Sequence, residues 1–234
     1  NSNFSYISKF NVESGKLSKP IYSKKDHEIA SLEVEDGEIK MVCYERFTRE
    51  CDLFDPEENG IIKSLKREFP DHYINISSYS KDSSRFIATI RNSNSPSKYF
   101  GFDKKTAKSF FISSQYPQLE KKINSVTKVI EYKSRDDYQL YGFLTLPKGV
   151  KNPPIILFPH GGPTARDRID YFDPWLQAMV SQGYAVFQPQ FRGSAGWGKD
   201  YQISGYRESG MKMQNDMIDG FDYVVQNYDL NGKK

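Results

Sequence analysis

The sequence lacks any long apolar run and has no visible export signal. No stretch of its 234 residues approaches the roughly 18 consecutive apolar residues of a membrane-spanning helix. The first ten residues, NSNFSYISKF, do not place a charged segment before an apolar one, which a secretory signal requires. We therefore expect a soluble protein without a membrane partner, and the sequence leaves the compartment open between cytoplasm and periplasm.

Cysteine is scarce as well. The two cysteines, Cys43 and Cys51, flank a predicted turn at residues 46–49. A structural zinc ion needs about four ligands, so this pair does not predict one, and no metal site is expected. Two free thiols and a cross-strand disulfide both remain compatible with the sequence, because spacing alone does not establish disulfide geometry.

The chain also lacks a large excess of charge of either sign. The chain has 33 Lys and Arg against 30 Asp and Glu, a net charge of +3. The basic residues are scattered, and no basic run is interleaved with aromatics, so nucleic acid is not an expected partner. Gly193, Gly196 and Gly198 do not fit the G-x-G-x-x-G spacing of a dinucleotide site, and no cofactor is predicted.

The absence with the greatest functional weight is that of a G-x-S-x-G motif. Ser194 in the segment GSAG comes near this pattern, but Arg192 stands where the first glycine is needed. We therefore interpret residues 190–198, QFRGSAGWG, as a glycine-rich loop and not as a nucleophile elbow. Arg192 and Trp197 are predicted, within that loop, to line a substrate cleft.

Residues 1–115 show the alternation of short strands separated by polar turns. Strands are expected at 29–34, 39–44, 73–78, 85–91, 99–102 and 109–113. A helix is predicted at 56–69, because Asp55-Pro56 is a helix-start signal and Pro70 ends the pattern. Many short strands indicate a sandwich, barrel or propeller, and the pattern alone does not choose among them.

Residues 116–234 have the pattern of an α/β domain. A linker opens this part, and strands are expected at 127–132, 140–146, 155–158 and 184–187. Asp173-Pro174 predicts a helix that ends before Gly183, which gives a βαβ unit, and a last helix is expected at 208–228. Asp216, Asp219 and Asp222 on that helix are interpreted as exposed or capping charges. Lys233-Lys234 is expected to lead into a further strand, so that the sheet is cut part-way.

The run at 155–163, IILFPHGGP, indicates a buried strand that delivers bare backbone to a reaction centre. Glycine N–H groups are unshielded and can hold a developing oxyanion, which points to acyl-transfer chemistry. Gly162 is the better candidate donor, because Pro163 has no N–H. Gly161 and His160 complete the loop, and His160 is expected to orient it by a side-chain hydrogen bond. The alternative is a tight turn that uses glycine only for its positive φ.

Several segments resemble the prolyl oligopeptidase family of serine peptidases, and most closely its acylaminoacyl-peptidase and dipeptidyl-peptidase-like branch. The similar segments are HGGPTARD at 160–167, FQPQFRGSAGWGKDY at 187–201 and MQNDMIDGFDYVV at 213–225. Upstream, FDPEENGIIKSLKREFPDH at 54–72, YSKDSSRFIATI at 79–90 and YFGFDKKTAKSFF at 99–111 resemble that family's last propeller blades.

The resemblance implies that residues 1–115 are the C-terminal blades of a β-propeller and that residues 116–234 are the N-terminal half of an α/β-hydrolase peptidase domain. It implies a Ser-Asp-His triad outside this chain, with the serine following Lys234, and hydrolysis of short peptides through an acyl-enzyme. The partners expected are a peptide substrate and the remaining part of the same hydrolase domain, and a homo-oligomer is left open.

This chain alone is expected to be inactive. The alternatives are a carboxylesterase of the same fold and a non-catalytic propeller module that binds a partner.

Overall fold

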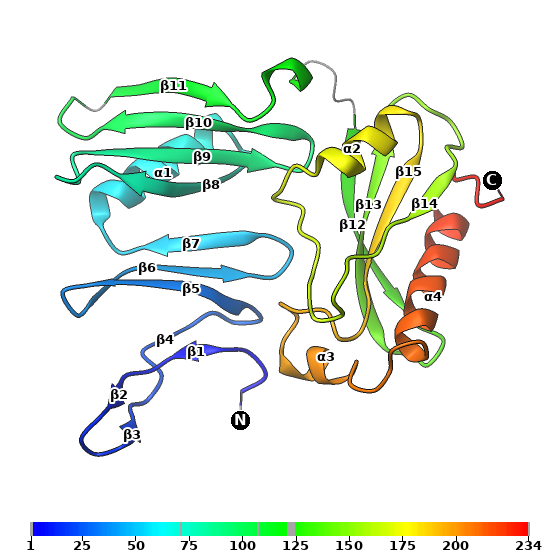
Figure 1. The fold of residues 1–234 in the computed structure, drawn as a ribbon, viewed down its shortest axis with the longest axis horizontal. Helices are drawn as coiled ribbons and strands as arrows, with labels where there is room; N and C mark the ends of the chain where they lie inside the picture. Colours follow the sequence, from blue (N-terminus) through cyan, green and yellow to red (C-terminus); the bar gives the residue numbers. More distant parts are fainter. Residues whose placement is uncertain (1, 71, 107, 121–124, 234) are drawn as a thin grey trace.

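The computed structural model describes residues 2–70, 72–106, 108–120 and 125–233. Two parts lie side by side, a stack of antiparallel strands and a mixed sheet with helices (Figure 1). None of the helices in these ranges is long and apolar enough to cross a membrane.

The strand-rich part contains four antiparallel groups. Two are short pairs, and the others have three and four strands. The pairs are β1 (Tyr6–Ile7) with β4 (Tyr22–Ser23) and β2 (Phe10–Asn11) with β3 (Lys16–Leu17). The three-stranded sheet holds β5 (Glu28–Glu35), β6 (Glu38–Glu45) and β7 (Arg49–Leu53). The four-stranded sheet runs in the order β11 (Lys108–Ser114), β10 (Ser95–Asp103), β9 (Arg85–Asn92) and β8 (Tyr73–Tyr79). The six strands predicted from the sequence in this part are all present.

Helix α1 (Pro56–Glu68) begins where the sequence predicts it. The carboxylate of Asp55 accepts the N–H of Glu58, and Pro56 occupies the first turn, where its missing N–H costs nothing. Ile62 and Leu65 bury one face of the helix in the core of the strand-rich part.

The two cysteines occupy opposite positions on neighbouring strands. Cys43 on β6 pairs directly with Cys51 on β7, and the two form a disulfide. Of the two alternatives that the sequence left open, the structure therefore contains the disulfide.

The second part is a four-stranded mixed sheet in the order β12 (Ser125–Lys133), β13 (Gln139–Pro147), β15 (Ala185–Gln190) and β14 (Ile155–Leu157). β14 and β15 are parallel and are joined through α2 (Pro174–Ser181), which gives the predicted βαβ unit. Helix α4 (Lys212–Asn227) lies along the side of the sheet that faces away from the strand-rich part (Figure 1). Phe187, with no exposed surface, lies at the centre of this core.

Some elements were not predicted. A short helix α3 (Lys199–Ile203) follows the glycine-rich loop, and a 3-10 turn covers Pro117–Leu119. Part of the predicted linker, at 121–124, lies outside the described residues, as does Lys234. After α4, Asn231 forms a parallel bridge with Pro154, on the side of β14 away from β15.

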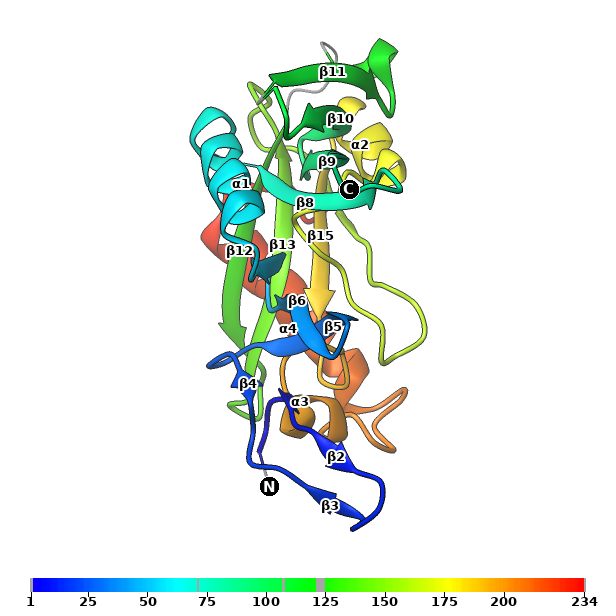
Figure 2. The ribbon, with the colours of Figure 1, turned by 90° about the vertical axis from the view of Figure 1, so that its left-hand side faces the viewer.

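Buried polar contacts join the two parts. Asp170, with no exposed surface, lies in the long loop after β14. Its carboxylate contacts the guanidinium of Arg91 on β9 at 3.4 Å and that of Arg168 at 2.9 Å. The backbone N–H of Arg49, at the start of β7, donates to the same carboxylate. The turn before β7 therefore lies against the loop that follows β14. Figure 2 views the molecule from the side of the strand-rich part, which stands in front of the mixed sheet.

Candidate active site

Two loops meet at the carboxyl ends of the parallel strands β14 and β15. The first, residues 158–173, carries the HGGP segment, and the second, residues 191–198, is the glycine-rich loop. The N–H of Ala195 in the second loop donates to the carbonyl of Ala165 in the first at 3.1 Å. In open α/β sheets, ligands bind outside the carboxyl ends of the strands, so this pair of loops is the candidate active site.

His160 links the two loops through its side chain. The imidazole stacks on the Phe191 ring with centroids 4.6 Å apart, and its Nε2 lies 2.9 Å from Ser194 Oγ. Nδ1 lies 3.2 Å from the carbonyl oxygen of Gly161. Burial lowers the pKa of His160, so the neutral ring is favoured at neutral pH. The predicted side-chain hydrogen bond is therefore present.

The His160–Ser194 pair has the spacing of a catalytic dyad but not its accessibility. Ser194 has no exposed surface, and its Oγ also lies 2.7 Å from the carbonyl oxygen of Phe191. A nucleophile must reach a substrate carbonyl, and a hydroxyl enclosed in this way does not. The pair therefore stabilises the loops, in agreement with the structural interpretation of the GSAG segment.

Gly161 and Gly162 present open backbone. Gly162 has φ of +56°, a conformation that glycine adopts without strain. A Cβ atom added at either glycine would meet no other atom within 4 Å. Neither N–H donates to a backbone carbonyl of the described residues, and the turn is closed by the N–H of Ala165 bonding to the Gly162 carbonyl at 2.8 Å.

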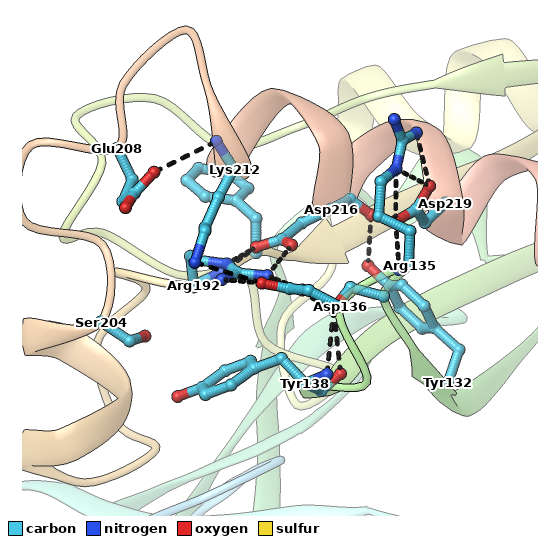
Figure 3. Close-up of polar contacts among 12 residues, drawn as sticks. Tyr132, Arg135, Asp136, Tyr138, Arg192, Ser204, Glu208, Lys212, Asp216 and Asp219 are labelled. Carbon is cyan, nitrogen blue, oxygen red and sulfur yellow. Dashed lines mark hydrogen bonds and ion pairs between the residues drawn. The ribbon is translucent and has the colours of Figure 1, made fainter.

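The structure does not place Arg192 in an open cleft. Its side chain is only 4% exposed, and its guanidinium bonds to the carboxylates of Asp216 and Asp136, each at 2.7 Å (Figure 3). These two partners raise the pKa of Arg192 further above its usual value, against the effect of burial, which lowers it. The prediction that Arg192 lines a substrate cleft is wrong for the described residues, because its guanidinium is buried and held by two carboxylates.

Trp197 is also enclosed. Its indole stacks on Tyr141 with ring centroids 4.4 Å apart, and only 6% of the residue is exposed. Phe47, from the turn before β7, packs edge-on against the same ring. Trp197 thus contacts both parts of the molecule. The prediction that it lines a substrate cleft is wrong for the described residues.

Two of the three aspartates of α4 differ from their prediction. Asp216 has no exposed surface, and Asp219 receives a two-pronged contact from Arg135, whereas Asp222 is exposed as predicted. The helical spacing of the sequence indicates the burial of Asp216. Asp216 lies on the same stripe as the buried residues Met213, Gly220 and Val224, and a carboxylate in a buried stripe requires a cationic partner.

Asp167 is the acidic group nearest to the HGGP turn in the chain. Burial raises its pKa to about 7, although the amide of Gln190 donates to its carboxylate at 3.2 Å. Near neutral pH this carboxyl group is therefore present in both protonation states.

No group of three or more His, Cys, Asp or Glu side chains is placed to hold a metal ion within the described ranges.

Comparison with known proteins agrees with this arrangement. Residues 170–234 match the sequence model of the prolyl oligopeptidase family. Over 201 residues the chain is 29% identical to dipeptidyl aminopeptidase BIII of Pseudoxanthomonas mexicana, an alignment that covers 81% of this chain and 29% of that protein. The chain is therefore similar to members of the prolyl oligopeptidase family.

A second curated relative also matches most of the chain. The chain is 24% identical to dipeptidyl peptidase family member 6 of Caenorhabditis elegans, over 92% of this chain and 32% of that protein. The chain thus spans about a third of the length of these curated relatives.

Solved structures share the fold. A puromycin-hydrolyzing peptidase of Mycobacterium tuberculosis superposes with a TM-score of 0.73 at 17% identity, over 98% of this chain and 37% of that one. An acylaminoacyl peptidase of Pyrococcus horikoshii gives 0.64 at 20% identity, over 93% and 34%.

Proposed function

We propose that this chain is part of a serine peptidase of the prolyl oligopeptidase family that hydrolyses short peptides, and that it supplies the oxyanion loop. The observation that carries the proposal is the open, left-handed Gly162 at the carboxyl end of β14. Its N–H donates to no backbone carbonyl among the described residues, and glycine has no side chain that would shield this N–H. An oxyanion donor requires both.

The division of the chain follows the same proposal. Residues 1–115 are propeller blades, and residues 116–234 are the first half of an α/β-hydrolase domain. The triad serine, aspartate and histidine belong to the rest of the protein. The parallel bridge between Asn231 and Pro154 supports this, because it starts a pairing on the free side of β14, where a further strand would lead to the nucleophile.

In the proposed reaction, the serine oxygen attacks the peptide carbonyl carbon and its proton passes to the triad histidine. The carbonyl oxygen gains negative charge, which the Gly162 N–H stabilises. The tetrahedral intermediate then breaks its C–N bond, and the histidine gives the proton to the departing amine. Water hydrolyses the acyl-enzyme by the same route. His160 acts as a positioning residue that holds the loop against Ser194.

The test uses the full-length protein and two variants of one glycine. Gly162→Pro removes the N–H, and we expect kcat to fall by about 100–1,000-fold, the usual effect of losing one oxyanion donor. Because proline does not adopt the positive φ of this residue, Gly162→Ala is the control: it strains the same backbone but keeps the N–H.

We expect Gly162→Ala to keep kcat within about tenfold of the parent protein, since a non-glycine residue at positive φ costs only about 1–2 kcal/mol. Equal losses in both variants would point to a merely structural turn. A fluorophosphonate adduct on the parent protein, together with cleavage of a peptide anilide in preference to a p-nitrophenyl ester, separates a peptidase from an esterase. The absence of any adduct favours a non-catalytic binding module.

A further inference from the structure

A cavity of about 520 Å³ lies between the two parts of the molecule. The strand-rich part contributes Glu45, at the end of β6, and Arg49, at the start of β7. The mixed sheet contributes Thr127, Thr145 and Gln188, and the loop after β14 contributes Arg166 and Arg168. The cavity therefore begins only four residues beyond the proposed oxyanion glycine, Gly162.

Three guanidinium groups at this cavity share one carboxylate. Glu45 lies 3.3 Å from Arg49, 3.6 Å from Arg166 and 3.9 Å from Arg168. The next carboxylate, Asp170, is fully buried and is paired with Arg168 and Arg91. The four arginines of this cluster therefore form ion pairs with only two carboxylates of the described residues, Glu45 and Asp170.

The two remaining carboxyl groups at the cavity do not restore the balance. Asp167 is partly protonated near neutral pH, because burial raises its pKa to about 7. Asp173 is engaged as the cap of α2, where its carboxylate accepts the N–H groups of Trp175 and Leu176.

Arg166 is the least satisfied of these cations. Its side chain is 8% exposed, and neither terminal nitrogen has a hydrogen-bond partner among the described residues. Within the part of the chain that the structure describes, its guanidinium makes one hydrogen bond, a long one of 3.5 Å from Nε to the carbonyl of Asp167. The group lies over the Trp197 ring at 5.4 Å, and Gly196 is required beside it, since a Cβ there would collide with the guanidinium. Arginine stays charged in proteins, and a buried charge with free donors is costly unless an acceptor binds it.

We propose that this cavity binds a carboxylate of the peptide substrate, with the fork of Arg166 as its main contact. The inference rests on the proposed peptidase function, which makes a peptide the molecule present at this place. A planar guanidinium donates two parallel hydrogen bonds to a carboxylate, a geometry that lysine and neutral donors do not offer. The carboxylate has two possible sources, the C-terminus of the peptide and an acidic side chain.

The experiment measures binding to the full-length protein by isothermal titration calorimetry. The probes are tetra-D-alanine and its C-terminal amide, whose inverted stereochemistry resists hydrolysis. A second pair, amidated D-Ala-D-Ala-D-Glu-D-Ala and its D-Gln analogue, tests the side-chain source. We expect the carboxylate member of at least one pair to bind about tenfold or more tightly than its neutral partner, as is typical of a hydrogen bond to a charged group.

The variants are Arg166→Gln, Arg166→Lys and a matched control, Arg85→Gln, whose side chain on β9 is 68% exposed. We expect Arg166→Gln to abolish the preference, Arg166→Lys to reduce it, and Arg85→Gln to retain it. Equal binding of acid and amide in both pairs by the unmodified protein overturns the inference, and this result does not depend on any variant folding.

Cleavage of L-tetra-alanine by the same sample keeps the two proposals separate. A preference for carboxylates without cleavage refutes the peptidase and leaves the anion site standing. Cleavage without any such preference does the reverse.

Discussion

At Arg192, one side chain holds three segments of the chain together. Its guanidinium contacts Asp136 in the β12–β13 turn and Asp216 on α4, and its backbone N–H also donates to Asp216 (Figure 3). Lys212 contacts the outer side of Asp136 at 3.3 Å. The base of the glycine-rich loop is thereby fixed to the helix behind the sheet, and the loop in turn supports His160.

We expect Asp216→Asn to lower the free energy of unfolding by about 3–5 kcal/mol, because it leaves a buried guanidinium without its main charged partner. Asp219→Asn is the control on the same helix, since Asp219 pairs with Arg135, whose side chain is 54% exposed. The control should cost about 1 kcal/mol or less. Urea unfolding of both variants measures the difference, and similar small losses would contradict a central role for the Arg192 pair.

At the scale of an element, α4 and α1 use glycine differently. Gly220 in α4 faces the sheet, where an added Cβ would lie 2.6 Å from the hydroxyl of Tyr132 and 2.8 Å from the Phe187 ring. Gly60 in α1 faces open space, and an added Cβ would meet nothing within 4 Å. Close packing on the sheet therefore requires glycine at position 220 of α4, whereas position 60 of α1 does not require it.

This contrast predicts opposite effects of the same substitution. Gly60→Ala should raise the free energy of unfolding by about 0.5–1 kcal/mol through helix propensity. Gly220→Ala gains the same propensity but is expected to lose about 1–3 kcal/mol by overpacking against the sheet. The midpoint of chemical unfolding reports both, and stabilisation by Gly220→Ala would show that α4 packs less closely on the sheet than described.

At the scale of the whole molecule, the strand-rich part and the mixed sheet share a buried ion cluster. Asp170 ties Arg91 on β9 and the backbone of Arg49 to the loop that follows β14. The same cluster borders the cavity proposed to hold a carboxylate, so the proposed substrate contact and the contact between the two parts depend on neighbouring residues.

We expect Asp170→Asn to lower the free energy of unfolding by about 3–5 kcal/mol and to separate the unfolding of the two parts into two calorimetric transitions. The arginines would then face each other with one carboxylate fewer. Asp103→Asn is the control, because its partner Arg85 is 68% exposed, and it should change stability by about 1 kcal/mol or less. A single, little-changed transition for Asp170→Asn would show that other contacts hold the parts together.

The sequence by itself determined the features that depend on near neighbours in the chain. Asp55-Pro56 and Asp173-Pro174 start α1 and α2 because a cap and its N–H partners lie within three residues. Gly183, with φ of +90°, follows α2 because the chain leaves this helix through a left-handed backbone conformation, which favours glycine. The same holds for Gly161 and Gly162 in the loop after β14, whose open backbone follows from the absence of side chains.

Only the tertiary structure decided which distant residues meet. Arg192 and Asp216 are 24 positions apart, and Arg91 and Asp170 are 79 apart, so no local pattern pairs them. The opposite register of Cys43 and Cys51, and the burial of Trp197 under Phe47, likewise depend on how strands and loops pack. Burial turns an arginine that the sequence assigns to a cleft into an anchor, because the partner that satisfies a charge is chosen by the fold and not by spacing along the chain.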